Sequence, residues 1–335
     1  MQKLIAREHV LLTDNILKTL SQNRIITLMD FLQEDAEKLS TLSKLSLPQI
    51  LEIRNHILDR YSAPLVNGIS LYSNRLTCKQ IVPTGITSLD AVLGNGIPVG
   101  FITEICGLAG SGKSQLCMQL AINCVKNTSS AVLYIDTKGD FSAVRVQKIL
   151  DSCGCSHKDM AVIMLKIKVI NIWHMEDLIN LFEELKNGVL IIENLSLIIL
   201  DSLPSLMFQH FGDDNKIGLK LLNYFVNYAR HISKGMEIGF VCVNIQTRWI
   251  DQDVEELEDD GNQSASTTRG TTYTEKWNRC LGKYWQNIPI KVLFLEKYQN
   301  SNENNISTIG VKVMKYNNPN LIQKCKLEVG PFGIG

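Results

Sequence analysis

The spacing of hydrophobic residues divides the chain into two parts of different character. In residues 1–60, apolar side chains recur every three or four positions, and this segment contains one proline and no glycine. Such spacing places apolar residues on one face of each of several short helices. Thr13, Asp30 and Ser46 stand at the start of such stretches and can cap them. The pattern predicts a small helical domain over residues 1–60.

Beyond residue 80, short apolar runs alternate with amphipathic stretches. Strand-like runs cover residues 101–106, 131–136, 162–171, 189–193, 195–201 and 238–244. Helical spacing covers residues 114–126, 142–151, 175–186 and 217–234. Three last strand-like runs cover residues 290–297, 306–316 and 321–329. This order predicts an α/β fold with a mostly parallel central sheet and an antiparallel edge, over a core of residues 81–335.

Residues 61–80 join the two parts and are predicted to form a linker, because Pro64 and Gly68 interrupt helical structure. Four apolar residues in this segment are candidate anchors for a partner: Val66, Ile69, Leu71 and Tyr72. They suit docking on a neighbouring subunit or packing on the chain's own core, and the sequence leaves both open. The helical domain is open in the same way, since it suits DNA-backbone contact or partner docking.

Composition limits the class of protein. The 335 residues carry a net charge of zero, so nucleic-acid contact requires a local patch rather than a global basic field. The first residues lack the apolar segment of a secretory signal, and no run is long enough to span a bilayer. The nine cysteines lack paired CxxC spacing, which favours reduced core thiols over a zinc site. We expect a soluble intracellular protein.

The strongest chemical signal is GLAGSGKS at residues 107–114, between a predicted strand and a predicted helix. Glycines let backbone N–H groups face phosphates, and the helix N-terminus adds the positive end of its dipole. Lys113 would reach the β- and γ-phosphates of ATP, and the Ser114 hydroxyl would bind Mg²⁺. We therefore expect eight residues to bind the nucleotide: Gly107, Leu108, Ala109, Gly110, Ser111, Gly112, Lys113 and Ser114.

A second Mg²⁺ ligand is expected at the end of a buried strand. Two strand-like runs end in an acid, one at Glu193 and one at Asp201. Four apolar residues precede Asp201 and Ser202 follows it, which favours Asp201 over Glu193. Asp201 would hold Mg²⁺ through water, opposite Ser114.

Residues 84–117 resemble the start of the ATPase core of RecA-type recombinases in their eukaryotic form. The segments LYID at 133–136, LIILDS at 197–202 and VCVN at 241–244 follow in that family's order. A helical domain and a linker also precede the core in the eukaryotic strand-exchange recombinase and its paralogues. The resemblance implies a RecA-like phosphate-loop ATPase core.

Within that set, VNGISLY at 66–72 and LGKYW at 281–285 most resemble the D paralogue. The resemblance implies ATP binding between neighbouring subunits and homologous-recombination repair in the nucleus. The expected partners are other RecA-type paralogues in a hetero-oligomer and single-stranded or branched DNA, with no membrane.

The resemblance also implies two DNA-facing loops, here at about 203–216 and 246–286. Basic residues of the second loop are candidate phosphate contacts: Arg248, Arg269, Lys276, Arg279 and Lys283. Aromatic residues of the same loop can stack on bases: Trp249, Trp277, Tyr284 and Trp285. The acidic run at 251–260 would oppose DNA binding, so a solvated loop with a packed tryptophan at its base is the alternative.

The departures from the family's pattern concern hydrolysis and assembly. Active members carry a catalytic Glu in an Ile-Asp-Thr-Glu-Gly pattern, and Lys138 stands at that position here. A protonated lysine cannot take a proton from water, although it could contact the γ-phosphate. Ile245 fills the slot of a γ-phosphate-sensing Gln, and Gln246 follows one residue later. Val66 and Ile69 replace the Phe-x-x-Ala polymerisation motif, which favours a specific partner over self-filaments.

The leading hypothesis is therefore an ATP-binding recombination mediator within a hetero-oligomer of paralogues, with weak or absent hydrolysis. The alternatives are a filament-forming DNA-dependent ATPase, a phosphate-loop small-molecule kinase, and a scaffold that needs no nucleotide. Lys138 and Ile245 argue against the ATPase, and an acidic loop poor in arginine argues against a kinase lid. The intact Lys113, Ser114 and Asp201 argue against the scaffold.

Overall fold

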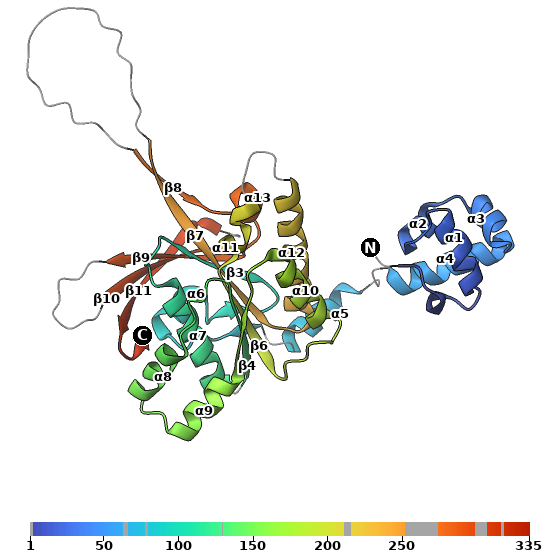
Figure 1. The fold of residues 1–335 in the computed structure, drawn as a ribbon. Helices are drawn as coiled ribbons and strands as arrows, with labels where there is room; N and C mark the ends of the chain where they lie inside the picture. The colour runs from blue at the N-terminus through green and yellow to red at the C-terminus, as the bar shows by residue number, and fades with distance from the viewer. Residues whose placement is uncertain are drawn as a thin grey trace, which may run out of the picture. The chain divides into compact units, whose positions relative to one another are not determined.

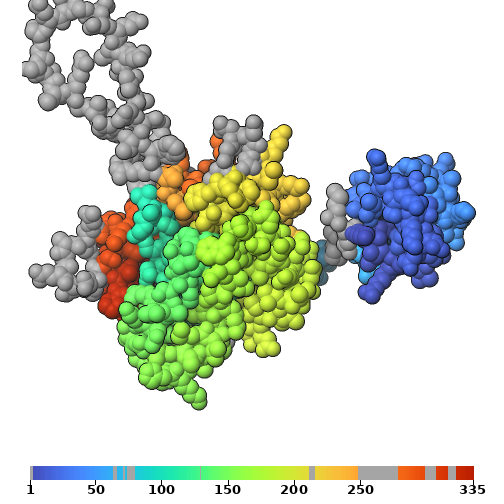
Figure 2. All heavy atoms as spheres, viewed as in Figure 1, coloured from blue at the N-terminus to red at the C-terminus, as the bar shows by residue number. Residues whose placement is uncertain are grey.

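The structure is a computed structural model with two compact units, Met1–Leu76 and Thr77–Gly335 (Figure 2). The described residues are 3–62, 66–77, 80–128, 130–210, 216–251, 274–298, 307–315 and 318–335. None of the described helices is long and apolar enough to cross a membrane.

The first unit confirms the predicted helical region. Its helices are η1 (Ala6–Glu8), α1 (Asp14–Gln22), α2 (Leu28–Gln33), α3 (Ala36–Ser43), α4 (Leu47–Tyr61) and α5 (Gly68–Thr77). Phe31, Leu39 and Ile53 are fully buried in a core made by α1 to α4. Thr27 and Asp30 cap α2 reciprocally, so the predicted start at Asp30 is wrong: Thr27 precedes the helix and Asp30 lies in its first turn. Ser46 precedes α4 in a capping box as predicted, whereas Thr13 precedes α1 without a side-chain cap hydrogen bond.

Helix α5 lies inside the segment that the sequence pattern predicts as a linker. Gly68 begins this helix and does not break one. The reason is local, because the Asn67 side chain accepts a hydrogen bond from the Ile69 N–H at 2.8 Å, as a residue preceding a helix commonly does.

The second unit is built on one large sheet, whose strand order is β12-β11-β10-β9-β3-β7-β6-β4-β5, with β8 paired to β7 (Figure 1). Neighbouring strands from β9 to β5 run parallel, while the pairs from β9 to β12 run antiparallel. This confirms the predicted α/β fold. The strands are β3 (Ile102–Gly107), β4 (Ala131–Asp136), β5 (Ile167–Asn171), β6 (Leu195–Asp201), β7 (Gly239–Asp251), β8 (Thr274–Arg279), β9 (Lys291–Tyr298), β10 (Ser307–Lys315), β11 (Asn318–Gly330) and β12 (Gly333–Ile334). A small separate sheet pairs β1 (Ile81–Val82) with β2 (Ile97–Pro98).

Three predicted elements of this unit are wrong. Residues 162–166 belong to a helix, and only the later part of the predicted third strand is extended. Residues 189–193 form no strand, and the predicted loop after Asp201 begins with a helix. The helices and short 3-10 turn are α6 (Thr87–Leu93), α7 (Lys113–Thr128), α8 (Ala143–Ser152), α9 (His157–Lys166), α10 (Met175–Lys186), α11 (Leu203–Met207), η2 (Phe208–His210), α12 (Lys216–Gly235) and α13 (Gly282–Gln286).

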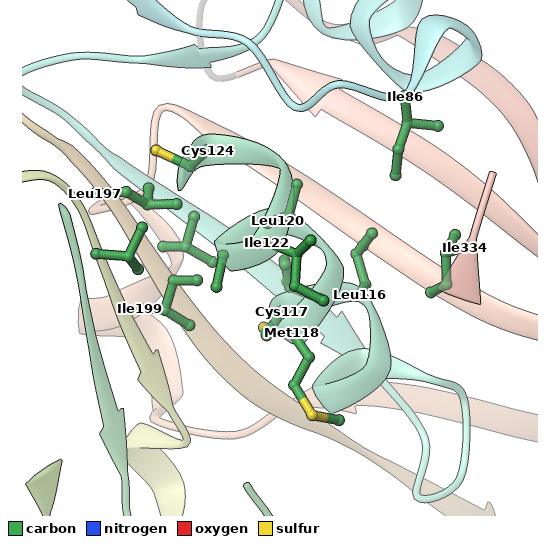
Figure 3. Packing of buried hydrophobic residues seen from close by; sticks show 14 of the residues in the cluster. Ile86, Leu116, Cys117, Met118, Leu120, Ile122, Cys124, Leu197, Ile199 and Ile334 are labelled. Atoms are coloured by element: carbon green, nitrogen blue, oxygen red, sulfur yellow. The ribbon is translucent and has the colours of Figure 1, made fainter. Parts of the chain in front are cut away.

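Helices cover both faces of the sheet, because alternate residues of each strand point to opposite faces. Leu197 and Ile199 of β6 pack in the cluster that contains Leu116 and Leu120 of α7 (Figure 3). Their neighbours on β6 pack in a second cluster, with α10 and α12. Strands buried on both faces read as continuous apolar runs, which is why β4 and β6 are predicted well.

Trp285 belongs to the second cluster and is fully buried. Its ring centroid lies 6.2 Å from that of Phe225 on α12. The prediction that Trp285 stacks on bases is therefore wrong for the described structure, and the alternative of a packed tryptophan at the base of the loop holds.

We expect Trp285→Ala to lower the free energy of unfolding by about 3–5 kcal/mol, because it empties a large buried site. Chemical denaturation of the full chain measures this. Trp173 is 56% exposed, so Trp173→Ala is the matched control, with an expected change within about 0.5 kcal/mol. Equal effects of the two substitutions would contradict the packing described here.

Candidate functional site

The site forms where the parallel strands end. The carboxyl ends of adjacent parallel strands meet at one edge of a sheet, where α/β proteins place their ligands. Gly107, at the end of β3, pairs in register with Ile245 of β7. Asp136, at the end of β4, pairs with Asp201 of β6. Residues far apart in the sequence thus come together at this edge.

The phosphate loop has the tight backbone that its glycines predict. A Cβ atom on Gly107 would lie 2.6 Å from the carbonyl oxygen of Leu295, and one on Gly112 would lie 2.3 Å from Ile309. Gly112 also has a φ of +93°, which side-chain-bearing residues rarely adopt. Helix α7 begins at Lys113, so its N-terminus faces the loop as expected for anion binding.

Lys113 is buried within this loop. Its Nζ donates hydrogen bonds to the carbonyl oxygens of Gly107, at 3.0 Å, and Leu108, at 2.6 Å. Burial lowers the pKa of Lys113, and the positive charge of Lys138 lowers it further. The two ammonium groups therefore lie within electrostatic reach of each other.

Lys138 makes the contact that distinguishes this site. Its Nζ lies 3.2 Å from Oδ1 of Asp201 and 3.0 Å from Oδ2 of Asp140. Burial alone would lower the pKa of Lys138, but Asp201 and Asp140 outweigh burial and raise it. Lys138 therefore holds its proton and cannot act as a general base.

Asp201 is 1% exposed, and Oδ2 accepts a hydrogen bond from the buried Tyr134 hydroxyl at 3.0 Å. Glu193, the alternative metal ligand, is exposed in a turn outside the sheet. Of the two acids, the structure places Asp201 alone at the end of a strand. Its two oxygens face one neutral donor and one cation.

The loop that carries Lys138 is fixed by hydrogen bonds of Asp136 and Thr137. Asp136 accepts hydrogen bonds from the N–H groups of residues 138–141, at 2.9–3.3 Å. Thr137 Oγ1 donates to the carbonyl oxygen of Ser202, at 2.8 Å, and Thr137 N–H donates to that of Asp201, at 3.0 Å. The loop after β4 is thus tied directly to the end of β6.

These residues fit a nucleoside triphosphate. Ser111 Oγ is buried and has no hydrogen-bond partner among the described residues, as suits a loop shaped for an anion. The Ser114 hydroxyl and the Asp201 carboxylate offer oxygens to Mg²⁺, which would neutralise phosphate charge when bound. No cluster of three His, Cys, Asp or Glu residues that could hold a metal ion occurs in the described ranges.

A buried polar network lies behind the loop and was not predicted from the sequence. Glu104, in β3, accepts hydrogen bonds from Asn244 at 2.6 Å and from Arg279 at 2.7 Å. Burial raises the pKa of Glu104, and Arg279 and Asn244 oppose that rise. The sequence held one indication of this network, because Glu104 is the single charged residue in the apolar run of β3.

Arg279 is therefore held by Glu104 and is not presented as a free phosphate contact. Lys283 is exposed on α13, whereas Arg269 and most of the acidic run lie outside the described residues. Arg248 of β7 is paired in register with Trp277 of β8, and the neighbouring pair joins Trp249 to Lys276. Tyr284 donates a hydrogen bond to Asn223. The structure thus places Arg248 and Lys276 on the β7–β8 hairpin, whose strand β8 ends at Arg279.

The predicted docking residues are presented to solvent where the structure describes their side chains. Val66, Ile69 and Tyr72 are 48%, 75% and 65% exposed. Leu71 lies on α5 with Ile69 and Tyr72. None of these exposed residues belongs to the described core clusters of the two units, and docking on a partner stays a prediction.

Comparisons with protein families and with known sequences both match this chain to recombination proteins. The model of the family described as Rad51 matches residues 76–260, more than half of the chain. The "DNA repair protein RAD51 homolog 4" of Bos taurus is 25% identical over 295 residues, which cover 87% of this chain and 84% of the bovine protein. The "DNA repair and recombination protein RadA" of Metallosphaera sedula is 28% identical over 236 residues, covering 68% of this chain and 72% of that protein.

Among solved structures, the chain is similar to that described as "Crystal structure of the RadB recombinase". The TM-score is 0.56 at 16% identity, and the match covers 76% of this chain and 98% of the other. This similarity concerns the fold.

We expect Arg279→Met to lower the free energy of unfolding by about 3–5 kcal/mol, because it leaves the Glu104 carboxylate buried without its cation. Chemical denaturation of the full chain is the measurement. The double variant Glu104→Gln with Arg279→Met should recover a large part of the loss, because no buried charge remains. Additive losses in the double variant would show that the two side chains do not interact.

Proposed function

Because the chain belongs to the Rad51 family, we propose that it is an ATP-binding mediator of recombination repair that assembles with other RecA-type paralogues. The predicted RecA-type family is thus confirmed, while the finer likeness to the D paralogue stays a prediction. The relatives are DNA repair and recombination proteins by name, which supports the proposed process. The nucleus is the compartment that this process implies.

The proposed ligand is ATP, held by the phosphate loop and the N-terminus of α7. Lys113 exchanges its carbonyl contacts with Gly107 and Leu108 for phosphate oxygens. Ser114 and Asp201 are the residues that could hold Mg²⁺, but Lys138 already contacts the Asp201 carboxylate at 3.2 Å. A scaffold without nucleotide would not require the close packing at Gly107 and Gly112.

The observation that carries the proposal is the Lys138 contact with Asp201. A general base must accept a proton, and Lys138 is an ammonium held between two carboxylates. Ile245 adds to this, because an apolar side chain cannot hydrogen-bond a γ-phosphate. Both features favour a retained ATP over a rapidly hydrolysed one, and they count against a filament-forming ATPase.

The proposed partners are other RecA-type subunits. Ile69 and Tyr72, on α5, and Val66, just before it, are exposed apolar residues. The core also offers an acceptor, since β5 ends the described sheet and is paired there only with β4. Leu165 and Ile191, at this edge, are 69% and 76% exposed. An open edge strand with apolar neighbours suits an extended segment of a neighbouring subunit.

DNA is the second proposed partner, through the β7–β8 hairpin that carries Arg248 and Lys276. The exposed Lys283 lies on α13, which follows β8 in the chain, and offers a further positive charge to DNA phosphates. Because the net charge of the chain is zero, we expect such contacts to be weak in the isolated chain and stronger in the assembly.

We expect the chain to bind ATP with little turnover, and Lys138→Glu to raise the turnover rate by at least about tenfold, because a positioned base contributes that much or more. Steady-state release of phosphate, with and without single-stranded DNA, measures the rate. Lys113→Ala is the control for binding and should abolish retention of ATP. Rapid DNA-stimulated turnover by the unmodified chain would contradict the mediator proposal.

We expect Ile69→Asp to weaken association with a RecA-type paralogue by at least about tenfold, because it places a charge at an apolar contact. Affinity between separately purified subunits of the same organism is the measurement. Ile217, on α12, is 67% exposed, so Ile217→Asp is the matched control and should leave the affinity unchanged. Equal effects of the two changes would argue against docking through this segment.

A further inference from the structure

Asp201, the carboxylate expected to hold Mg²⁺, already has a cation of the chain beside it. Lys138 Nζ lies 3.2 Å from one oxygen, and the Tyr134 hydroxyl lies 3.0 Å from the other. Asp201 is 1% exposed, so its carboxylate is shielded from water and depends on these two contacts. A water of a bound metal ion would have to share this carboxylate with the ammonium group.

The position of the Lys138 ammonium group is set by the hydrogen bonds that fix the loop after β4. Asp136 holds the N–H groups of residues 138–141, and Thr137 joins the same loop to Ser202. Gly139, with a φ of +76°, allows the tight turn. A loop tied at both ends keeps Lys138 close to the end of β6, so the contact is a property of the fold.

The charge of Lys138 opposes a metal ion at Asp201. The Lys138 ammonium group already contacts this carboxylate at 3.2 Å, and Asp140 contacts the same ammonium group at 3.0 Å. A fixed ammonium group repels a second cation and attracts a polyphosphate, and both effects are strong in a partly buried site.

We propose that Lys138 takes the place of the divalent cation as counter-charge for a bound nucleoside triphosphate, so that this chain binds ATP without Mg²⁺. The inference rests on the proposed ATP binding and adds the form of the ligand, which is the metal-free triphosphate. Lys113 contacts its phosphates from the loop, and Lys138 faces them from the end of β4.

The experiment measures the dissociation constant of ATP for the full chain by calorimetry, in excess MgCl₂ and in excess EDTA. For the unmodified chain, the two values should agree within about threefold. For Lys138→Gln, the value in EDTA should rise by at least about tenfold and Mg²⁺ should restore most of the affinity.

Two further variants keep the test specific. Lys138→Arg preserves the charge and should bind ATP in EDTA as the unmodified chain does. Lys158, on α9, is exposed, so Lys158→Gln is the matched control for loss of one positive charge. It should change neither dissociation constant, and thermal unfolding of each variant confirms that it is folded.

The outcomes separate the two proposals. If ATP binds the unmodified chain at least about tenfold more weakly in EDTA, the inference is overturned while the proposed function stands. If Lys138→Gln binds ATP equally well in both buffers, Lys138 is not the counter-charge and the inference is also overturned. If ATP binds in neither buffer, as with Lys113→Ala, the proposed nucleotide binding itself fails.

Discussion

The contact between Lys138 and Asp201 is the interaction on which the account of this site depends. It places a permanent cation at 3.2 Å from the carboxylate that ends β6, in a site where a related protein with Glu would carry a negative charge. A base that activates water and an ammonium group have opposite effects on hydrolysis, whereas both are compatible with a bound triphosphate. We propose that this one substitution separates ATP binding from ATP hydrolysis.

The surrounding structure preserves this contact. Asp136 and Asp201 pair in register on β4 and β6, and the backbone of the loop after β4 is bound to both. Behind the phosphate loop, Glu104 joins β3 to β7 and to the end of β8 through Asn244 and Arg279. The ion pair between Glu104 and Arg279 holds the base of the β7–β8 hairpin against β3, which stabilises this edge of the sheet.

The sequence predicted the elements whose signal is local. The apolar run of β4, the amphipathic spacing of α10 and the glycine spacing of the phosphate loop each lie within one short continuous segment, so the sequence alone reveals them. The prediction of a strand at residues 162–166 was wrong because α9 ends at Lys166 and β5 begins at Ile167, with no glycine, proline or turn between them. The contact of Lys138 with Asp201 could not be predicted, because it depends on the register in which β4 and β6 pair. Arg279 was expected at DNA for the same reason, because its buried partner lies 175 residues away.

The central claim is that this chain holds ATP intact. The identity of the nucleotide bound to the full chain after prolonged incubation with ATP, and after removal of the free nucleotide, tests it most directly. Chromatography of the nucleotide released on denaturation should give ATP in near-equal amount to the protein, both with single-stranded DNA and without it. Recovery of ADP in place of ATP would contradict the claim, because it would show that hydrolysis proceeds with Lys138 at the position of the base.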